Sequence, residues 1–138
     1  MRYFRGTRLD QFKGNYDPET GLLSIPDDRK FYFYKAFSLG EMIVHLGSKN
    51  GAGGYAVRNA GKHDDYPAIL SGKIYEGSTK VHYIGSEVYY IKTDSVPVDR
   101  VYLGRKSWIA KITDGIILTP AWFKRMEPND KRLEELVI

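Results

Sequence analysis

Short strand-like runs, separated by turn residues, are the feature that most constrains the fold of this 138-residue chain. The clearest is Lys-Phe-Tyr-Phe-Tyr-Lys at 30–35, because aromatic residues strongly favour strands. Glycine-containing connections at 76–78 and 85–86 are short enough for hairpins, so we expect the runs around them to form an antiparallel meander. The other runs with strand character lie at 2–7, 22–25, 66–75, 80–84, 87–93, 96–103, 108–112 and 116–118.

Helical signals are fewer, and the first follows the aromatic run. Ser38 and Glu41 have the spacing of a capping box, and apolar residues follow at helical intervals, which predicts a helix over 39–46. The next stretch, 49–65, begins with a predicted glycine-rich loop, Asn-Gly-Ala-Gly-Gly at 50–54, followed by Tyr-Ala-Val and a polar stretch. It matches neither a Walker A loop nor a dinucleotide-binding glycine fingerprint.

The C-terminal part of the chain carries the remaining helical signals. Segments 120–126 and 128–137 are predicted to be helical, the second with Asn129 or Asp130 as its N-cap. Together the runs predict an α+β fold in a single domain, 1–138. We expect a mostly antiparallel, twisted sheet with one early helix and one or two C-terminal helices.

Composition excludes several kinds of protein. The chain has no cysteine, which rules out disulfides, thiolate metal sites and cysteine nucleophiles. Its three histidines are not spaced as a pair of ligands, so we expect no metal site. We also expect a cytoplasmic protein without a membrane segment, because no apolar run approaches the roughly 20 residues of a membrane helix and the N-terminus lacks an apolar signal core. The net charge of +4 permits an acidic partner.

Three separated segments combine residue types suited to a dinucleotide. Tyr-Phe-Arg-Gly-Thr stands at 3–7, and Phe-Tyr-Phe-Tyr at 31–34 precedes the first predicted helix. The third segment, 83–91, places Glu87 at the start of an apolar strand. In this order and spacing the segments resemble the ADP-ribosyltransferase superfamily, whose members cleave NAD. The resemblance implies an ADP-ribosyltransferase-like fold and NAD as the substrate.

The resemblance also implies a role for each matching residue. Arg5 and Gly6 would hold NAD, since an Arg fork suits a ribose-phosphate and glycine lets the backbone approach the nicotinamide amide. Tyr32, with Tyr34 as the alternate, would stack on the nicotinamide ring. Glu87 would be the catalytic carboxylate, stabilising the oxocarbenium-like charge that develops when the glycosidic bond breaks.

The match covers about residues 1–103, and 104–138 form a C-terminal extension of unknown role. Where some members of the family carry a second stacking tyrosine, this chain offers Ile43 and His45, so we expect that second aromatic to be absent or replaced. Members that modify arginine carry Glu or Gln two residues before the catalytic Glu, where this chain has Gly85. The acceptor of ADP-ribose, whether a macromolecule or a small molecule, is therefore open.

Three functions remain in competition at this point. The first is an NAD-dependent ADP-ribosyltransferase or a related NAD-cleaving enzyme. The second is a small basic nucleic-acid-binding module, which the positive charge and the 11 tyrosines favour. The third is an interaction protein without catalytic activity, such as a phage or mobile-element factor.

Overall fold

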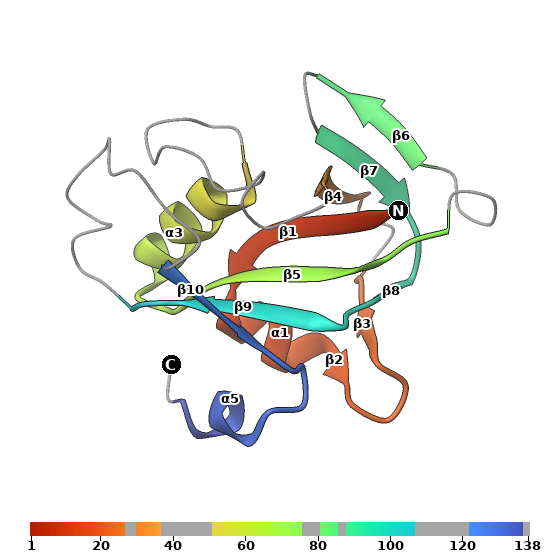
Figure 1. The fold of residues 1–138 in the computed structure, drawn as a ribbon. Helices are drawn as coiled ribbons and strands as arrows, with labels where there is room; N and C mark the ends of the chain where they lie inside the picture. Colours follow the sequence, from red (N-terminus) through yellow and green to blue (C-terminus); the bar gives the residue numbers. More distant parts are fainter. Residues whose placement is uncertain (27–29, 37–50, 76–80, 86–87, 107–121, 137–138) are drawn as a thin grey trace.

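The computed structural model describes residues 1–26, 30–36, 51–75, 81–85, 88–106 and 122–136. This part of the chain has an α+β fold, with a large antiparallel sheet and few helices (Figure 1). In spatial order the strands of the large sheet are β10 (Phe123–Met126), β9 (Arg100–Gly104), β5 (Pro67–Lys73), β1 (Arg2–Arg8), β4 (Lys30–Lys35), β7 (Val88–Lys92) and β6 (Val81–Ile84). The other elements are the small sheet of β2 (Tyr16–Asp17), β3 (Leu22–Ser24) and β8 (Ser95–Pro97) and the helices α1 (Leu9–Asn15), α3 (Ala52–His63) and α5 (Lys131–Glu135).

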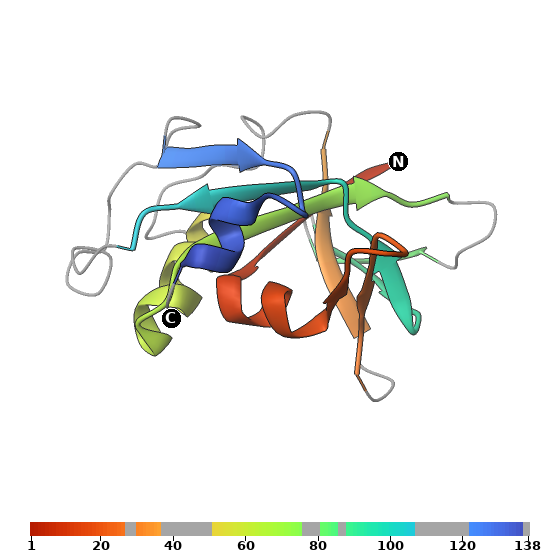
Figure 2. The ribbon, with the colours of Figure 1, turned by 90° about the horizontal axis from the view of Figure 1, so that it is seen from below.

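The large sheet buries apolar side chains on both faces, because successive residues of a strand point to opposite sides. On one face Tyr3 and Phe31 belong to a core that includes residues of α1, α5 and the small sheet. Figure 2 shows α1 and α5 next to one another, and the Lys13 ammonium donates to the Leu136 carbonyl at 3.0 Å. On the other face Phe4 and Tyr34 pack with α3. The site described below lies mainly on this second face, although Arg5, which alternates with Phe4 along β1, starts from the first.

Several sequence predictions are confirmed. The first run forms β1, the aromatic run forms β4, and β6 and β7 form an antiparallel pair around Gly85. Near the C-terminus Asp130 is the N-cap of α5, because its carboxylate accepts the Arg132 N–H at 2.9 Å. The same carboxylate also binds the Arg132 guanidinium, and the two interactions hold the pKa of Asp130 at about 2.

The predicted glycine-rich loop is wrong. Ala52–His63 forms α3, the longest helix of the described residues, although Gly53 and Gly54 are poor helix formers. Both glycines are buried, as are Ala52 and Ala56. Small residues here allow the helix to lie close against the sheet, and this tertiary packing outweighs their low propensity.

Helix α1 was not predicted, and the reason is its cap. The residue at its N-cap, Arg8, makes no capping side-chain bond. Instead Asp65, which follows α3, accepts the Asp10 N–H at 3.0 Å and the Tyr66 N–H at 2.6 Å. A carboxylate 55 positions away therefore satisfies the first turn of α1, and no local sequence pattern reports it.

Two further expectations are corrected. The predicted helix 120–126 is wrong where it is described, since Phe123–Met126 is strand β10 and pairs with β9 at the edge of the sheet. The predicted meander is wrong in part, because β5 pairs with β1 and β9 rather than with β6. The predicted helix 39–46 and strands 108–112 and 116–118 lie outside the described residues. Among the helices that are described, none is long and apolar enough to cross a membrane.

Candidate functional site

The large sheet divides between β1 and β4. These two strands pair at only two positions, Tyr3 with Lys35 and Phe4 with Tyr34. Beyond Phe4, β1 continues to pair with β5, while β4 continues to pair with β7. Past this point the edge of β1 that faces β4 has no partner among the described strands, so it can offer backbone N–H and C=O groups to a ligand.

A pocket of about 340 Å³ occupies this division. We call it the central pocket. Its volume lies at the lower end of the range of about 300–1,000 Å³ usual for small-molecule sites. It brings together residues from β1, β4, α3 and β7, which are Arg5, Gly6, Thr7, Tyr32, Phe33, Tyr34, Tyr55, Asn59 and Val88.

Arg5 crosses the division between the two strands. Its Nη1 donates to the Tyr32 carbonyl at 2.8 Å, and its Cζ lies 4.8 Å from the centroid of the Phe31 ring. No carboxylate among the described residues forms an ion pair with it. Burial lowers the pKa of the Arg5 guanidinium, which stays charged because its ordinary value lies far above neutrality. One of its five N–H donors is used by the Tyr32 carbonyl, and no described residue accepts a hydrogen bond from the other four.

Gly6 sets how closely α3 approaches β1. A Cβ at this position would overlap the Ala52 carbonyl oxygen and would lie 2.9 Å from the Ala56 nitrogen. These are backbone atoms of α3, so they cannot turn aside as the end of a flexible side chain would. The absent side chain therefore places α3, and with it Tyr55, at the wall of the central pocket.

The two tyrosines expected to stack on nicotinamide both line the central pocket, but they differ in exposure. Tyr32 is 43% exposed, whereas Tyr34 is 6% exposed and belongs to the core under α3. Tyr32 is thus the one with a ring free to receive a ligand. The structure adds a third aromatic residue, Tyr55 of α3, which is 54% exposed.

Tyr55 and Asn59 are the site residues that sequence reasoning missed. Neither Ile43 nor His45, where a second aromatic was sought, lies within the described residues. Tyr55 was missed because it directly follows the predicted glycine-rich loop, in a stretch where no helix is expected. The pattern Ala-Gly-Gly-Tyr-Ala-Val carries the signal, since its small residues can pack closely on a sheet and so bring the tyrosine beside it.

Glu87, the expected catalytic carboxylate, lies outside the described residues. Its chain neighbour Val88 begins β7 and lines the central pocket. Arg5, Gly6, Tyr32 and Tyr34, the other residues expected at the site, all line that same pocket.

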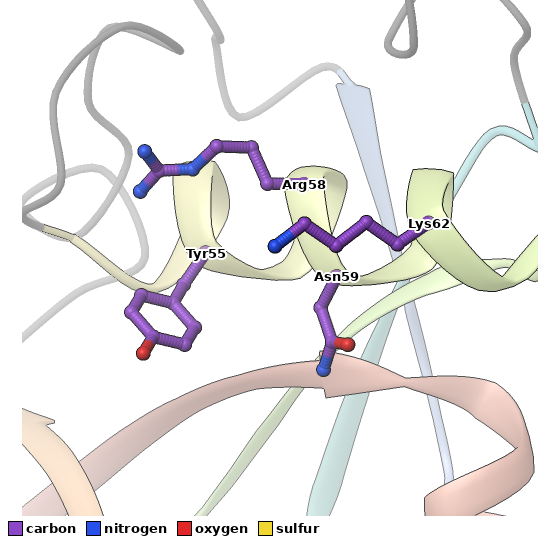
Figure 3. Close-up of a pocket in the computed structure, with 4 residues that line it drawn as sticks. All are labelled: Tyr55, Arg58, Asn59 and Lys62. Atoms are coloured by element: carbon purple, nitrogen blue, oxygen red, sulfur yellow. The ribbon is translucent and has the colours of Figure 1, made fainter.

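A second cavity, of about 400 Å³, adjoins the central pocket along α3. Figure 3 shows its four lining residues: Tyr55 and Asn59 point toward β1, while Arg58 and Lys62 extend along the outside of the helix. We call this cavity the basic pocket. Tyr55 and Asn59 line both pockets. In the described part of the chain, no cluster of three or more histidine or acidic side chains could hold a metal ion.

No protein-family model matches the chain, and neither a curated protein nor a solved structure matches it. The function must therefore be argued from the geometry of the two pockets and the residues around them.

Proposed function

We propose that this protein is an NAD-cleaving enzyme of the ADP-ribosyltransferase type, with the nicotinamide riboside half of NAD in the central pocket. The observation that supports this most is the convergence of the segments that suggested it. Residues of 3–7 and 31–34 meet at one pocket, and Val88 of the third segment lines it as well. A resemblance made by chance from short motifs would not require them to converge.

The chemistry of the pocket suits such a ligand. Arg5 is a half-buried cation without a carboxylate partner among the described residues, so an anionic group of a ligand would complement its charge. A phosphate group of NAD would supply the missing charge. The edge of β1 that no described strand pairs with can bind the carboxamide of nicotinamide, and Tyr32 and Tyr55 offer rings for stacking.

The proposed reaction breaks the bond between the ribose C1′ and the nicotinamide nitrogen. Nicotinamide leaves as a neutral molecule with the bonding electron pair, and the ribosyl group becomes oxocarbenium-like. The Glu87 carboxylate stabilises that positive charge. A nucleophile on the acceptor, or water, then forms a bond to C1′ and gives up its proton. Gly85 in place of an acidic or amide residue argues against arginine as the acceptor.

The test combines ligand binding with turnover. NAD is expected to raise the melting temperature, since a ligand at about 100 times its Kd stabilises the folded state by about 2.7 kcal/mol. Glu87→Gln is expected to lower nicotinamide release by about 100-fold or more while leaving NAD binding intact. The matched control is Glu19→Gln, an exposed residue in the turn between β2 and β3.

A second pair of variants tests the pocket itself. Tyr55→Ala is expected to weaken NAD binding by about fivefold or more, because it removes one stacking ring from the wall. Its control is Tyr83→Ala, which removes a tyrosine of similar exposure, 57%, from outside the pocket. If NAD leaves the melting temperature unchanged, or if Glu87→Gln retains full turnover, the proposal is wrong.

A further inference from the structure

Three aromatic rings form a row across the outer strands of the large sheet. Tyr32 of β4 stands opposite Tyr90 of β7, and Tyr90 stands opposite His82 of β6. The His82 and Tyr90 rings are stacked, with centroids 4.9 Å apart and planes at 18°, and the Tyr32 and Tyr90 centroids are 5.8 Å apart. His82 and Tyr32, at the two ends, are exposed. We call these three residues the aromatic row.

The aromatic row lies on the same face of the sheet as α3. Tyr34, two residues after Tyr32 on β4, packs in the core beneath that helix, and alternate residues of a strand share a face. The row is continuous with the central pocket through Tyr32, and the central pocket is continuous with the basic pocket through Tyr55 and Asn59. One surface track therefore runs from α3 across the central pocket to β7 and β6.

Within their bounds, the helix and strands that form this track carry positive charge and no negative charge, and Glu87, the carboxylate of the proposed reaction, directly precedes β7. The sequences of α3, β4, β6 and β7 contain none of the chain's 17 Asp and Glu residues. Lys30 lies with its Nζ 4.4 Å from the centroid of the Tyr90 ring. At the other end, Arg58 and Lys62 make no ion pair with any described residue, and their charged ends both point back along α3 (Figure 3).

We propose that this track binds single-stranded nucleic acid. Unpaired bases would extend the stack at the exposed ends of the aromatic row, and Lys30, Arg58 and Lys62 would contact phosphates. Stacking on exposed rings beside a basic groove is the general way in which proteins hold single strands, since every base has a π-face. A duplex buries those faces, and an acidic protein would use the cations without using the rings.

The direct test is fluorescence anisotropy with labelled single-stranded DNA and RNA oligonucleotides of about 12 nucleotides, without NAD. We expect the wild-type affinity to be larger for a single strand than for a duplex of the same sequence, because only the single strand exposes its base faces to the aromatic row. Arg58→Gln combined with Lys62→Gln is expected to reduce the slope of log K against log salt by about 1.4, since each phosphate contact on a single strand contributes about 0.7. Comparison of the DNA and RNA arms identifies which of the two is preferred.

The aromatic row is tested by two kinds of substitution at one site. Tyr90→Leu is expected to weaken single-strand binding about tenfold, whereas Tyr90→Phe keeps the ring and is expected to keep the affinity. A ring that only stabilised the β6–β7 pair would lower the melting temperature in Tyr90→Leu without this effect on binding by the folded protein. His82→Ala, at the exposed end of the row, is expected to act like Tyr90→Leu.

The matched charge control is Lys124→Gln combined with Lys131→Gln, which removes two exposed cations from β10 and α5. This variant is expected to keep the wild-type salt slope. Absence of single-strand binding at about 50 mM salt, or equal slopes in the two double variants, overturns the proposal. The proposal is also overturned if polyglutamate binds as tightly as the oligonucleotides and Tyr90→Leu does not weaken that binding. This result would indicate an acidic protein as the partner. None of these outcomes depends on whether the protein cleaves NAD.

Discussion

The contact between Gly6 and α3 yields the sharpest structural prediction. Replacing Gly6 with alanine puts a methyl group where the Ala52 carbonyl oxygen already lies, with the Ala56 nitrogen 2.9 Å and the Ala52 carbonyl carbon 3.0 Å away. All three are backbone atoms. The methyl group can be accommodated only if α3 moves away from β1, or if β1 bends, because no rotamer change relieves the overlap.

The size of the effect follows from what must move. Inserting a methyl group into a well-packed interior typically costs about 1–3 kcal/mol. Here the shift also loosens the packing of Ala52, Ala56 and Val57, which are at most 1% exposed. We therefore expect Gly6→Ala to lose about 2–3 kcal/mol of unfolding free energy and about 5–10 °C of melting temperature. NAD binding is expected to weaken as well, since α3 carries Tyr55.

Urea denaturation and thermal melting measure the loss, and a second glycine provides the control. Gly14 lies in α1 with no atom within 4 Å of the position that its Cβ would take. Gly14→Ala is expected to be neutral or to gain up to about 1 kcal/mol, since alanine is the better helix former. If Gly6→Ala proves as stable as Gly14→Ala to within about 0.5 kcal/mol, α3 does not approach β1 as described, and the wall of the central pocket is misplaced.

Two further predictions concern carboxylates. Asp65→Ala is expected to cost about 1–2 kcal/mol in urea denaturation, because it leaves the Asp10 and Tyr66 N–H groups without their acceptor; a loss below about 0.3 kcal/mol would contradict the capping role. Asp99 accepts two bonds from the Arg2 guanidinium, which holds the pKa of Asp99 below its ordinary value. The stabilisation is therefore present above about pH 4 and lost as the pH falls through the lowered pKa. Wild type is expected to exceed Asp99→Asn in unfolding free energy by about 0.5–1 kcal/mol near neutral pH, and this difference is expected to vanish in acid. A difference that grows in acid would contradict the assignment.

The sequence predicted those helices and strands whose determining residues lie within or next to the element itself. The aromatic run of β4 and the Asp130 cap of α5 each lie within a few residues of the structure they specify. Helix α1 depends on Asp65, and α3 depends on the space left by Gly6, so both need a partner more than 40 residues away along the chain. For the same reason β10 was mistaken for a helix: its pairing with β9 is invisible in its own four residues.

The candidate site was predictable where strands alone supply it. Arg5, Gly6, Tyr32 and Tyr34 stand on β1 and β4, two strands that the sequence predicts. Alternation explains why Tyr32 and Tyr34 share a face, but Arg5 and Gly6 are neighbours on β1 and meet the pocket only where the sheet divides. Tyr55 and Asn59 belong to α3, a helix that the sequence did not predict, so their place in the central pocket could not be predicted either. The aromatic row needed the register of three strands, since His82 and Tyr90 meet only through the pairing of β6 with β7.

The division between β1 and β4 has a physical logic that links fold and function. A sheet gains stability from every paired position, and an unpaired strand edge exposes N–H and C=O groups that require partners. Here the pairing stops after Phe4, although both strands continue. Arg5 bridges the division with a single bond to the Tyr32 carbonyl, and α3 lies along β1 beside it. Full pairing would satisfy these groups internally and would leave no space for a ligand. Under the proposed function, the carboxamide of NAD would take the pairing positions of β1 that no described strand fills. A phosphate of NAD would face Arg5, which has no carboxylate partner among the described residues.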